Sequence, residues 1–109
     1  MPYDLKLADR IRKEMDREAN LEEKKMFGGV GYLIDGNMAC GVHGGDLIVR
    51  VGPEKYEAGL AQPHTRPFDM TGRPMAGWIM VAPQDCALDV DLKDWIAQGV
   101  ALARSLPPK

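Results

Sequence analysis

The segment VGYLIDGNMACGVHGGDLIVRV (Val30–Val51) contains two turn signals that separate three apolar runs. The turn signals are Asp35-Gly36-Asn37 and His43-Gly44-Gly45-Asp46, and both are rich in residues that tolerate positive φ angles. A hairpin centred on each turn places apolar residues opposite one another on one face of three antiparallel strands. The predicted pairs are Ile34–Met38, Tyr32–Cys40 and Val30–Val42 across the first turn, and Val42–Leu47, Cys40–Val49 and Met38–Val51 across the second. Because both turns give the same face, the segment predicts a three-stranded meander.

The other face of this meander is expected to be unusually bare, because Gly31, Ala39 and Gly41 lie near its middle. A sheet surface with few side chains indicates that another backbone approaches closely. We therefore expect either a helix of the same chain or a second copy of the protein to cover this face. A homodimer is thus one of the two predicted arrangements.

Helices are predicted on both sides of the meander. Apolar residues at spacings of three and four indicate a helix over residues 3–19. After the meander, Pro53 at a first helical position predicts a short helix to about residue 61. Asp91 is expected to cap a final helix that runs to about Leu106.

Two further strands are expected between the short helix and the final one, at Phe68–Met70 and Met75–Ala82. The predicted element order is αβββαββα. This order defines an α+β fold, with an antiparallel sheet of about five strands and flanking helices. A chain of 109 residues has room for one such domain, spanning residues 1–109.

Composition and charge narrow the class of protein. The net charge of −2 gives no global field that would draw the chain onto nucleic acid or an acidic membrane, so neither partner is expected. The charged N-terminal residues do not resemble a secretory signal, and no uncharged run reaches the roughly 20 residues of a membrane span. Two cysteines are too few for a disulfide framework. We therefore expect a cytoplasmic protein with reduced thiols.

The glycine-rich stretch MFGGVG (Met26–Gly31) lacks the features of a nucleotide-binding motif. No lysine follows its glycines at the spacing of a P-loop. A dinucleotide fingerprint would need a third glycine at the position of Ile34, followed by a helix rather than a strand. The glycines instead suit a bulge and close packing where the chain enters the sheet. No cofactor is predicted.

Metal and catalytic sites are not predicted either. Cys40 and His43 have a spacing found in metal sites, but side chains three apart on a strand point to opposite faces. His64 and Cys86 would have to join them from distant loops. The only serine, Ser105, lies at the end of the last predicted helix, so no nucleophile with an adjacent base is evident. We expect no catalytic residues and no enzyme activity.

Four basic residues form a stripe on the first predicted helix, opposite its apolar side: Lys6, Arg10, Lys13 and Arg17. One interpretation is a solvated face supported by pairs such as Asp9–Lys13. Another is a docking site for an acidic surface of a protein partner. Binding to duplex nucleic acid is the weakest interpretation, because a few charges without interleaved aromatic residues give modest affinity in physiological salt.

Arg66, Asp69 and Arg73 cluster around the turn between the last two predicted strands and could hold a small anion. Arg50 of the predicted meander completes the set of candidate ligands. Arginine beside a tight turn more often forms a local salt bridge. A small-ligand or anion site, conceivably that of an enzyme, is therefore the alternative to a surface that binds protein.

A resemblance to a known family is carried by three segments: KKMFGGVGYLIDGNMACGV (Lys24–Val42), DLIVRVGPE (Asp46–Glu54) and RPFDMTGRPMAGWIMV (Arg66–Val81). In combination they resemble the N-terminal domain of the TfoX/Sxy family. The resemblance implies an α+β domain with an antiparallel sheet, similar to secretion-chaperone-like folds. It supplies no catalytic residues to transfer.

The resemblance also implies a kind of function. Named members of the family regulate competence for DNA uptake in bacteria, as coactivators that act with the cyclic-AMP receptor protein. Those regulators carry a second, helix-rich C-terminal domain, whereas this sequence ends at Lys109. We therefore expect a stand-alone, non-enzymatic interaction or regulatory domain that works through protein contacts.

Overall fold

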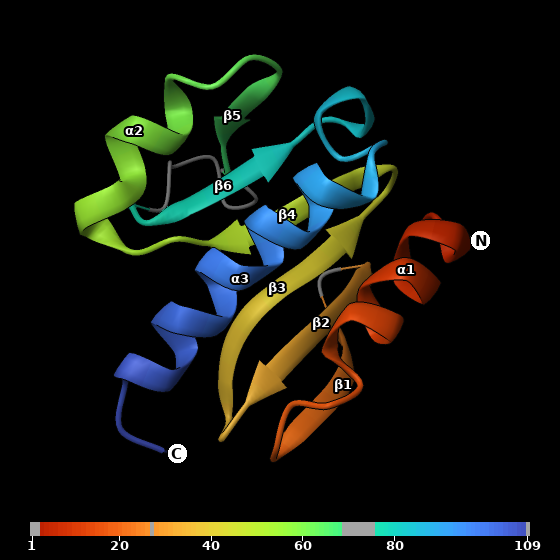
Figure 1. Ribbon diagram of the computed structural model, residues 1–109, viewed down its shortest axis with the longest axis vertical. Coiled ribbons are helices and arrows are strands. Elements are labelled where there is room, and N and C mark those ends of the chain that lie inside the picture. The colour runs from red at the N-terminus through yellow and green to blue at the C-terminus, as the bar shows by residue number, and fades with distance from the viewer. Residues whose placement is uncertain (1–2, 27, 69–75, 109) are drawn as a thin grey trace.

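The computed structural model describes residues 3–26, 28–68 and 76–108. These residues form a six-stranded antiparallel sheet in the order β1-β2-β3-β4-β6-β5, with α1 and α3 lying across it (Figure 1). The helices are α1 (Leu5–Met15), α2 (Tyr56–Leu60) and α3 (Asp89–Ser105), with 3₁₀ turns η1 (Pro53–Lys55) and η2 (Pro83–Asp85). The strands are β1 (Leu21–Met26), β2 (Gly29–Ile34), β3 (Asn37–His43), β4 (Asp46–Arg50), β5 (Thr65–Pro67) and β6 (Trp78–Val81). The predicted α+β class is confirmed.

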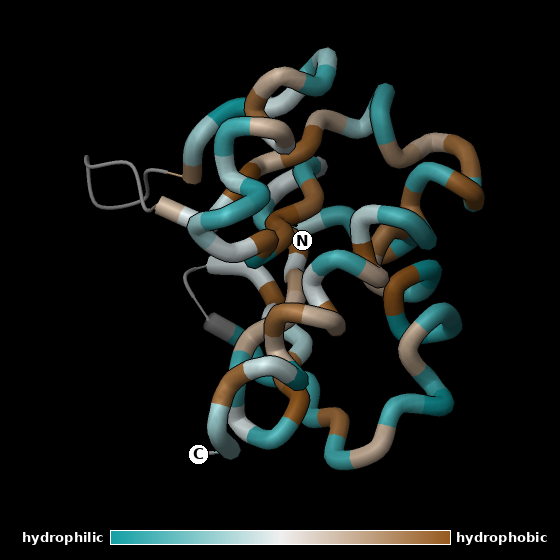
Figure 2. The backbone as a smooth tube through the Cα atoms, turned by 60° about the vertical axis from the view of Figure 1, so that its left-hand side comes forward, coloured by the Kyte–Doolittle hydropathy of each residue, from teal (hydrophilic) through white to brown (hydrophobic). Residues whose placement is uncertain are grey.

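One core cluster joins one face of the sheet to the helices. Ile11 of α1, Leu92 of α3 and Val49 of β4 are all buried in it, and side chains of α2 pack against it. Hydrophobic and hydrophilic residues alternate along the turns of the helices (Figure 2). Burial of the hydrophobic members of this pattern is the main favourable term that holds the helices on the sheet.

The predicted register of the meander is confirmed at its centre. The structure pairs Val30 with Val42, and it pairs Cys40 with both Tyr32 and Val49. Val42 also pairs with Leu47, as the second turn predicts. Tyr32, Cys40 and Val49 are fully buried in the core cluster, so the predicted face is the one that packs on the helices.

The register is wrong beside the first turn, where Leu33 pairs with Met38 and Ile34 pairs with Asn37. The reason is the length of the turn. Asp35 and Gly36 both have positive φ, at 54° and 84°, and together they form a two-residue loop instead of the three-residue loop that the prediction used. The chain recovers the predicted register through a β-bulge after Tyr32.

This bulge also changes which residues face the helices. Ala39 joins the core cluster, whereas Met38 moves to the opposite face. The predicted pair of Met38 with Val51 is not formed, because the β3–β4 ladder ends at Cys40 and Val49.

The structure also corrects the prediction for the second face of the sheet. Gly31 and Gly41 pair with each other there, as expected. The helices of the described residues, however, pack on the opposite face. The glycine face instead carries a second apolar cluster, which consists of Leu33, Met38, Ile48, Phe68 and Met80 with Trp78 packed against it. A second copy of the protein on this face remains a prediction.

Strand β1 was not predicted, so the sheet has one strand more than expected. Its sequence LEEKKM has no apolar alternation because β1 is an edge strand with mostly exposed side chains. Charged residues on an edge strand disfavour pairing with other chains. The side chain of Glu23 also accepts hydrogen bonds from Arg12 of α1, at 3.0 and 3.2 Å.

The ends of the last three elements differ from the predictions by a few residues. β5 ends at Pro67, just before the predicted strand Phe68–Met70, of which residues 69 and 70 lie outside the described residues. β6 lies inside the predicted range Met75–Ala82. The helix α3 begins at Asp89 with Leu88 at its N-cap, so the prediction that Asp91 caps it is wrong. Asp91 lies instead in the first turn, where a carboxylate interacts favourably with the helix dipole.

Candidate functional site

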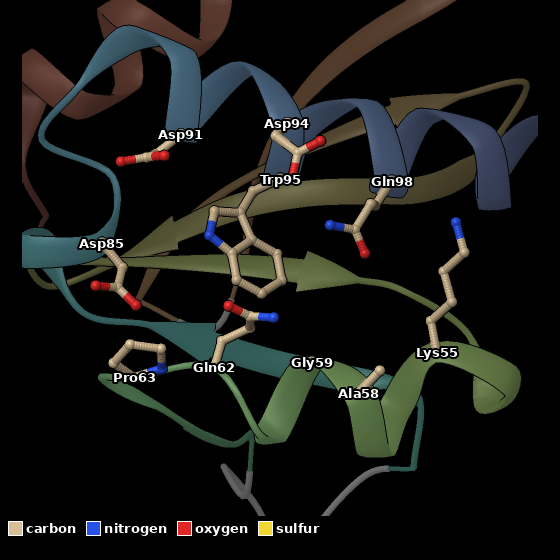
Figure 3. Close-up of a pocket in the computed structure, with 10 residues that line it drawn as sticks. All are labelled: Lys55, Ala58, Gly59, Gln62, Pro63, Asp85, Asp91, Asp94, Trp95 and Gln98. Atoms are coloured by element: carbon tan, nitrogen blue, oxygen red, sulfur yellow. The ribbon is translucent and has the colours of Figure 1, made fainter.

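A cleft of about 530 Å³ opens between α2 and α3 (Figure 3). Its lining comes from three separate parts of the chain: residues 55–63, Asp85 in η2, and the face of α3 from Asp91 to Gln98. This volume lies within the range of roughly 300–1,000 Å³ that small-molecule sites occupy. The cleft is therefore large enough for a small ligand or for a single side chain of a partner.

Trp95 forms the inner wall of the cleft. Its side chain projects from α3 toward α2 and is only 7% exposed (Figure 3). Gly59 faces it from α2, and a Cβ atom on Gly59 would collide with the side chain of Ile79. Because Gly59 has no side chain, α2 can lie close to the sheet and to Trp95.

The indole N–H of Trp95 has no hydrogen-bond acceptor among the described residues. Tryptophan N–H groups usually find a partner when the ring is buried. Every fully buried side-chain nitrogen or oxygen of the described residues does have a partner. The indole nitrogen therefore reaches the open volume of the cleft, on the side of Asp85 and Asp91 (Figure 3).

Carboxylates dominate the charge of the cleft. Asp91 and Asp94 are exposed on α3 and form no ion pair with any described residue. Asp85 lies at the same end of the cleft as Asp91, with its Oδ1 atom 3.0 Å from Nδ1 of His64 (Figure 3). Lys55 is the one cation among the described lining residues and lies toward the other end (Figure 3). The lining thus combines an aromatic ring, three carboxylates and hydrogen-bonding groups, and this combination suits binding.

The lining offers no nucleophile with an adjacent base. Its described residues include no serine, threonine, cysteine or histidine. Among residues 3–26, 28–68 and 76–108, no group of three or more histidine, cysteine, aspartate or glutamate side chains is placed to hold a metal ion.

The predicted basic stripe is divided into two parts by the structure. Arg10 donates hydrogen bonds to the carbonyl oxygen of Ala87, at 3.1 Å, and to the carboxylate of Asp89, at 3.0 Å, so it attaches α1 to the start of α3. The other three, Lys6, Lys13 and Arg17, are exposed and have no ion pair with a described residue. The suggested Asp9–Lys13 pair is replaced by one between Asp9 and Arg12.

Two of the four candidate anion ligands can be placed, and each has a partner within the chain. The guanidinium of Arg50 lies 5.1 Å from the ring centroid of Trp78, as a cation–π contact. Arg66 forms an ion pair with Asp46. Asp69 and Arg73 lie outside the described residues, so the four-residue anion site remains a prediction.

The two cysteines are structural parts of the core. Cys40 is fully buried, and its thiol lies 3.6 Å from the sulfur of Met15. Burial raises the pKa of Cys40 to about 12 and also raises the pKa of Cys86. A thiol with a raised pKa is a poor nucleophile at neutral pH, because the reactive form is the thiolate.

Sequence reasoning missed the cleft because no single motif encodes it. Its parts lie between Lys55 and Gln98, and only tertiary packing brings them together. One signal was present: Asp91 and Asp94 flank the face of α3 on which Trp95 lies, and acidic residues at these spacings share one side of a helix.

Fold and site together define a small α+β domain that presents an open binding cleft and charged surfaces. The family model of the TfoX N-terminal domain matches residues 14–103, so the chain belongs to the TfoX N-terminal domain family. Searches of curated proteins and of solved structures found no match. In the part of the chain that the structure describes, no helix has the length and apolar character needed to cross a membrane.

Proposed function

We propose that this chain is a cytoplasmic regulatory domain that acts by binding another protein and not by catalysis. Its family supports a small domain of regulatory or interaction type. The observation that carries the proposal is the set of exposed cations on the first helix and the turn after it: Lys6, Lys13 and Arg17 have no ion pair with a described residue. We call these three residues the α1 basic face.

The helix that carries the α1 basic face is held in a fixed position on the rest of the domain. α1 and the turn after it are tied to the two ends of α3, by Arg10 with Asp89 at 3.0 Å and by Glu18 with Arg104 at 2.7 Å. Each of these exposed pairs adds roughly 1 kcal/mol or less to stability. Their main effect is to fix the position of α1, whose apolar side is buried in the core cluster.

An acidic protein surface is the complementary partner for the α1 basic face. Lys6 and Lys13 are seven residues apart, or roughly 10 Å along the helix, which fits a compact acidic patch. Asp9 lies on α1 and Asp16 at its C-cap, and the chain as a whole has a net charge of −2. Both features disfavour a nucleic-acid backbone. A coactivator-like role, through contact with another regulator, follows from this preference.

The test compares two double charge reversals of the tagged chain. Lys6→Glu with Lys13→Glu reverses the α1 basic face, while Arg10 is kept because it holds α1 in place. Lys24→Glu with Lys25→Glu makes the same charge change on β1, at exposed residues without an ion pair among the described residues and outside the cleft between α2 and α3. Partners are captured from native lysate with and without nuclease treatment, and circular dichroism checks that each variant folds.

We expect the parent and the β1 control to capture the same acidic protein and the α1 variant to lose it. Charge complementarity is the reason, since like charges brought together at an interface weaken association. Equal capture by both folded variants would show that the α1 basic face is only solvated. Capture that disappears after nuclease treatment would show that nucleic acid is the partner.

A further inference from the structure

We propose that the cleft between α2 and α3 is a second binding site, one that receives a guanidinium or ammonium group together with a neighbouring carbonyl oxygen. This chemistry is that of a basic amino acid, either free or within a peptide. The site is separate from the α1 basic face, since its lining lies on η1, α2, η2 and α3. The cleft is acidic, whereas the α1 basic face is positively charged.

The preference for a cation follows from the unpaired carboxylates. Asp91 and Asp94 have no cationic partner among the described residues, and Asp85 contacts only the exposed His64. The start of α3 carries the positive end of a helix dipole, equivalent to about half a charge. Three carboxylates outweigh this half charge and the single charge of Lys55, so the cleft attracts cations.

Trp95 gives the second and independent indication of a ligand. Trp95 is more than nine-tenths buried, yet its indole N–H reaches the cleft without an acceptor from the described residues. A donor that faces an open cleft bonds to water, and a ligand that brings an acceptor replaces that water without losing the hydrogen bond. A carbonyl oxygen next to a cationic side chain supplies one.

The aromatic ring suits the rest of such a ligand. The aliphatic stem of arginine or lysine can pack on the indole, and the charged head is attracted to an aromatic face. The carboxylates of Asp85 and Asp91 lie on the same side of the cleft as the indole nitrogen (Figure 3). The head of the ligand and its carbonyl oxygen would therefore both lie at the acidic end.

The experiment follows the indole N–H of Trp95 by ¹H–¹⁵N correlation spectroscopy at physiological salt. The chain has two tryptophans, and Trp78→Phe identifies which indole signal belongs to Trp95. The probes are free arginine and Nα-acetyl-arginine amide, each added up to about ten millimolar. Free arginine represents a small metabolite, whereas the blocked form represents a residue of a partner protein.

We expect a saturable shift of the Trp95 signal. Asp94→Asn should weaken binding about fivefold, the upper end for one solvent-exposed charge pair. Asp91→Asn combined with Asp94→Asn should weaken it at least tenfold. Glu22→Gln on β1 makes the same charge change as the single variant, outside the cleft, and should change the affinity less than twofold.

The two probes identify the source of the ligand. Tighter binding of the blocked form assigns the site to a basic side chain of a partner, and tighter binding of free arginine assigns it to a small molecule. A Trp95 signal that does not move with either probe, or that moves equally in the parent and the double variant, would overturn the proposal. Neither result bears on the α1 basic face, whose residues are unchanged in these variants.

Discussion

Gly99 lies where α3 crosses β3 so closely that a Cβ atom on it would collide with the carbonyl oxygen of Ala39. Helix propensity alone would favour alanine over glycine by about 1 kcal/mol. Packing disfavours alanine here, because the carbonyl oxygen of Ala39 belongs to the backbone and cannot rotate away as a side chain could. Ala39 occupies this position only because of the β-bulge, so the contact could not be predicted from the sequence alone, although Gly99 falls on the apolar side of the helix.

We predict that Gly99→Ala lowers the free energy of unfolding by about 2 kcal/mol, since overpacking outweighs the gain in helix propensity. Chemical denaturation followed by circular dichroism measures the change. Gly45→Ala is the matched control, because its new methyl group would lie 3.8 Å from Pro83, an ordinary contact. A stabilised Gly99→Ala variant would show that α3 does not approach β3 this closely.

The buried thiol of Cys40 leads to a second prediction, which concerns the pH dependence of stability. Burial raises its pKa in the folded protein to about 12, whereas the thiol of the unfolded chain has a pKa of about 8.5. Its contribution to stability is therefore complete below about pH 8.5 and is lost as the pH rises toward 12. At pH 10 the loss is about 2 kcal/mol relative to neutral pH.

The measurement is the free energy of unfolding at pH 7 and pH 10 for the parent and for Cys40→Ala. Alanine costs stability at both values because it leaves a cavity. The parent should nevertheless lose more stability than the variant between the two pH values. Burial is also the largest cause of the raised pKa of Tyr32, and it acts in both proteins. Equal losses would mean that the thiol ionises in the folded state.

At the scale of elements, the sequence was most informative where two signals coincided. The meander was predicted because turn residues and apolar alternation agreed on both hairpins, and the pairs at Cys40 are those observed. The prediction failed next to Asp35 and Gly36, because the turn there is one residue shorter than predicted and this difference shifts the register. The prediction also missed β1. Its four charged residues give no strand pattern in the sequence, and it is held in the sheet by its pairing with β2.

This edge strand leads to a third prediction. Lys24 and Lys25 lie on β1, which has a neighbouring strand on one side only. Replacing both by valine should cause self-association, because an apolar edge with free backbone groups pairs with other chains. Light scattering should give a larger mass for the valine variant than for the parent at the same concentration. Replacement of both by glutamine, which stays polar, should leave the mass unchanged; a valine variant with the parent's mass would contradict this role of the charges.

At the scale of the whole molecule, charge is divided between two regions of the surface. The cations of the α1 basic face, and the carboxylates of Asp91 and Asp94 in the cleft between α2 and α3, have no ion pair with a described residue. The first could be predicted from helical spacing, apart from Arg10, whose partners Ala87 and Asp89 are distant in sequence. The second could not, because its lining is assembled from distant parts of the chain.

The central claim is that the α1 basic face binds an acidic protein partner. The most direct test is the association rate constant of the captured partner, measured at low and at physiological salt. The parent's rate should fall as salt rises, since exposed charges are screened over about 8–10 Å. Lys6→Glu with Lys13→Glu should slow association about tenfold at low salt, whereas Lys24→Glu with Lys25→Glu should change it little. Equal rates for the two variants, or a parent rate that does not depend on salt, would contradict the claim.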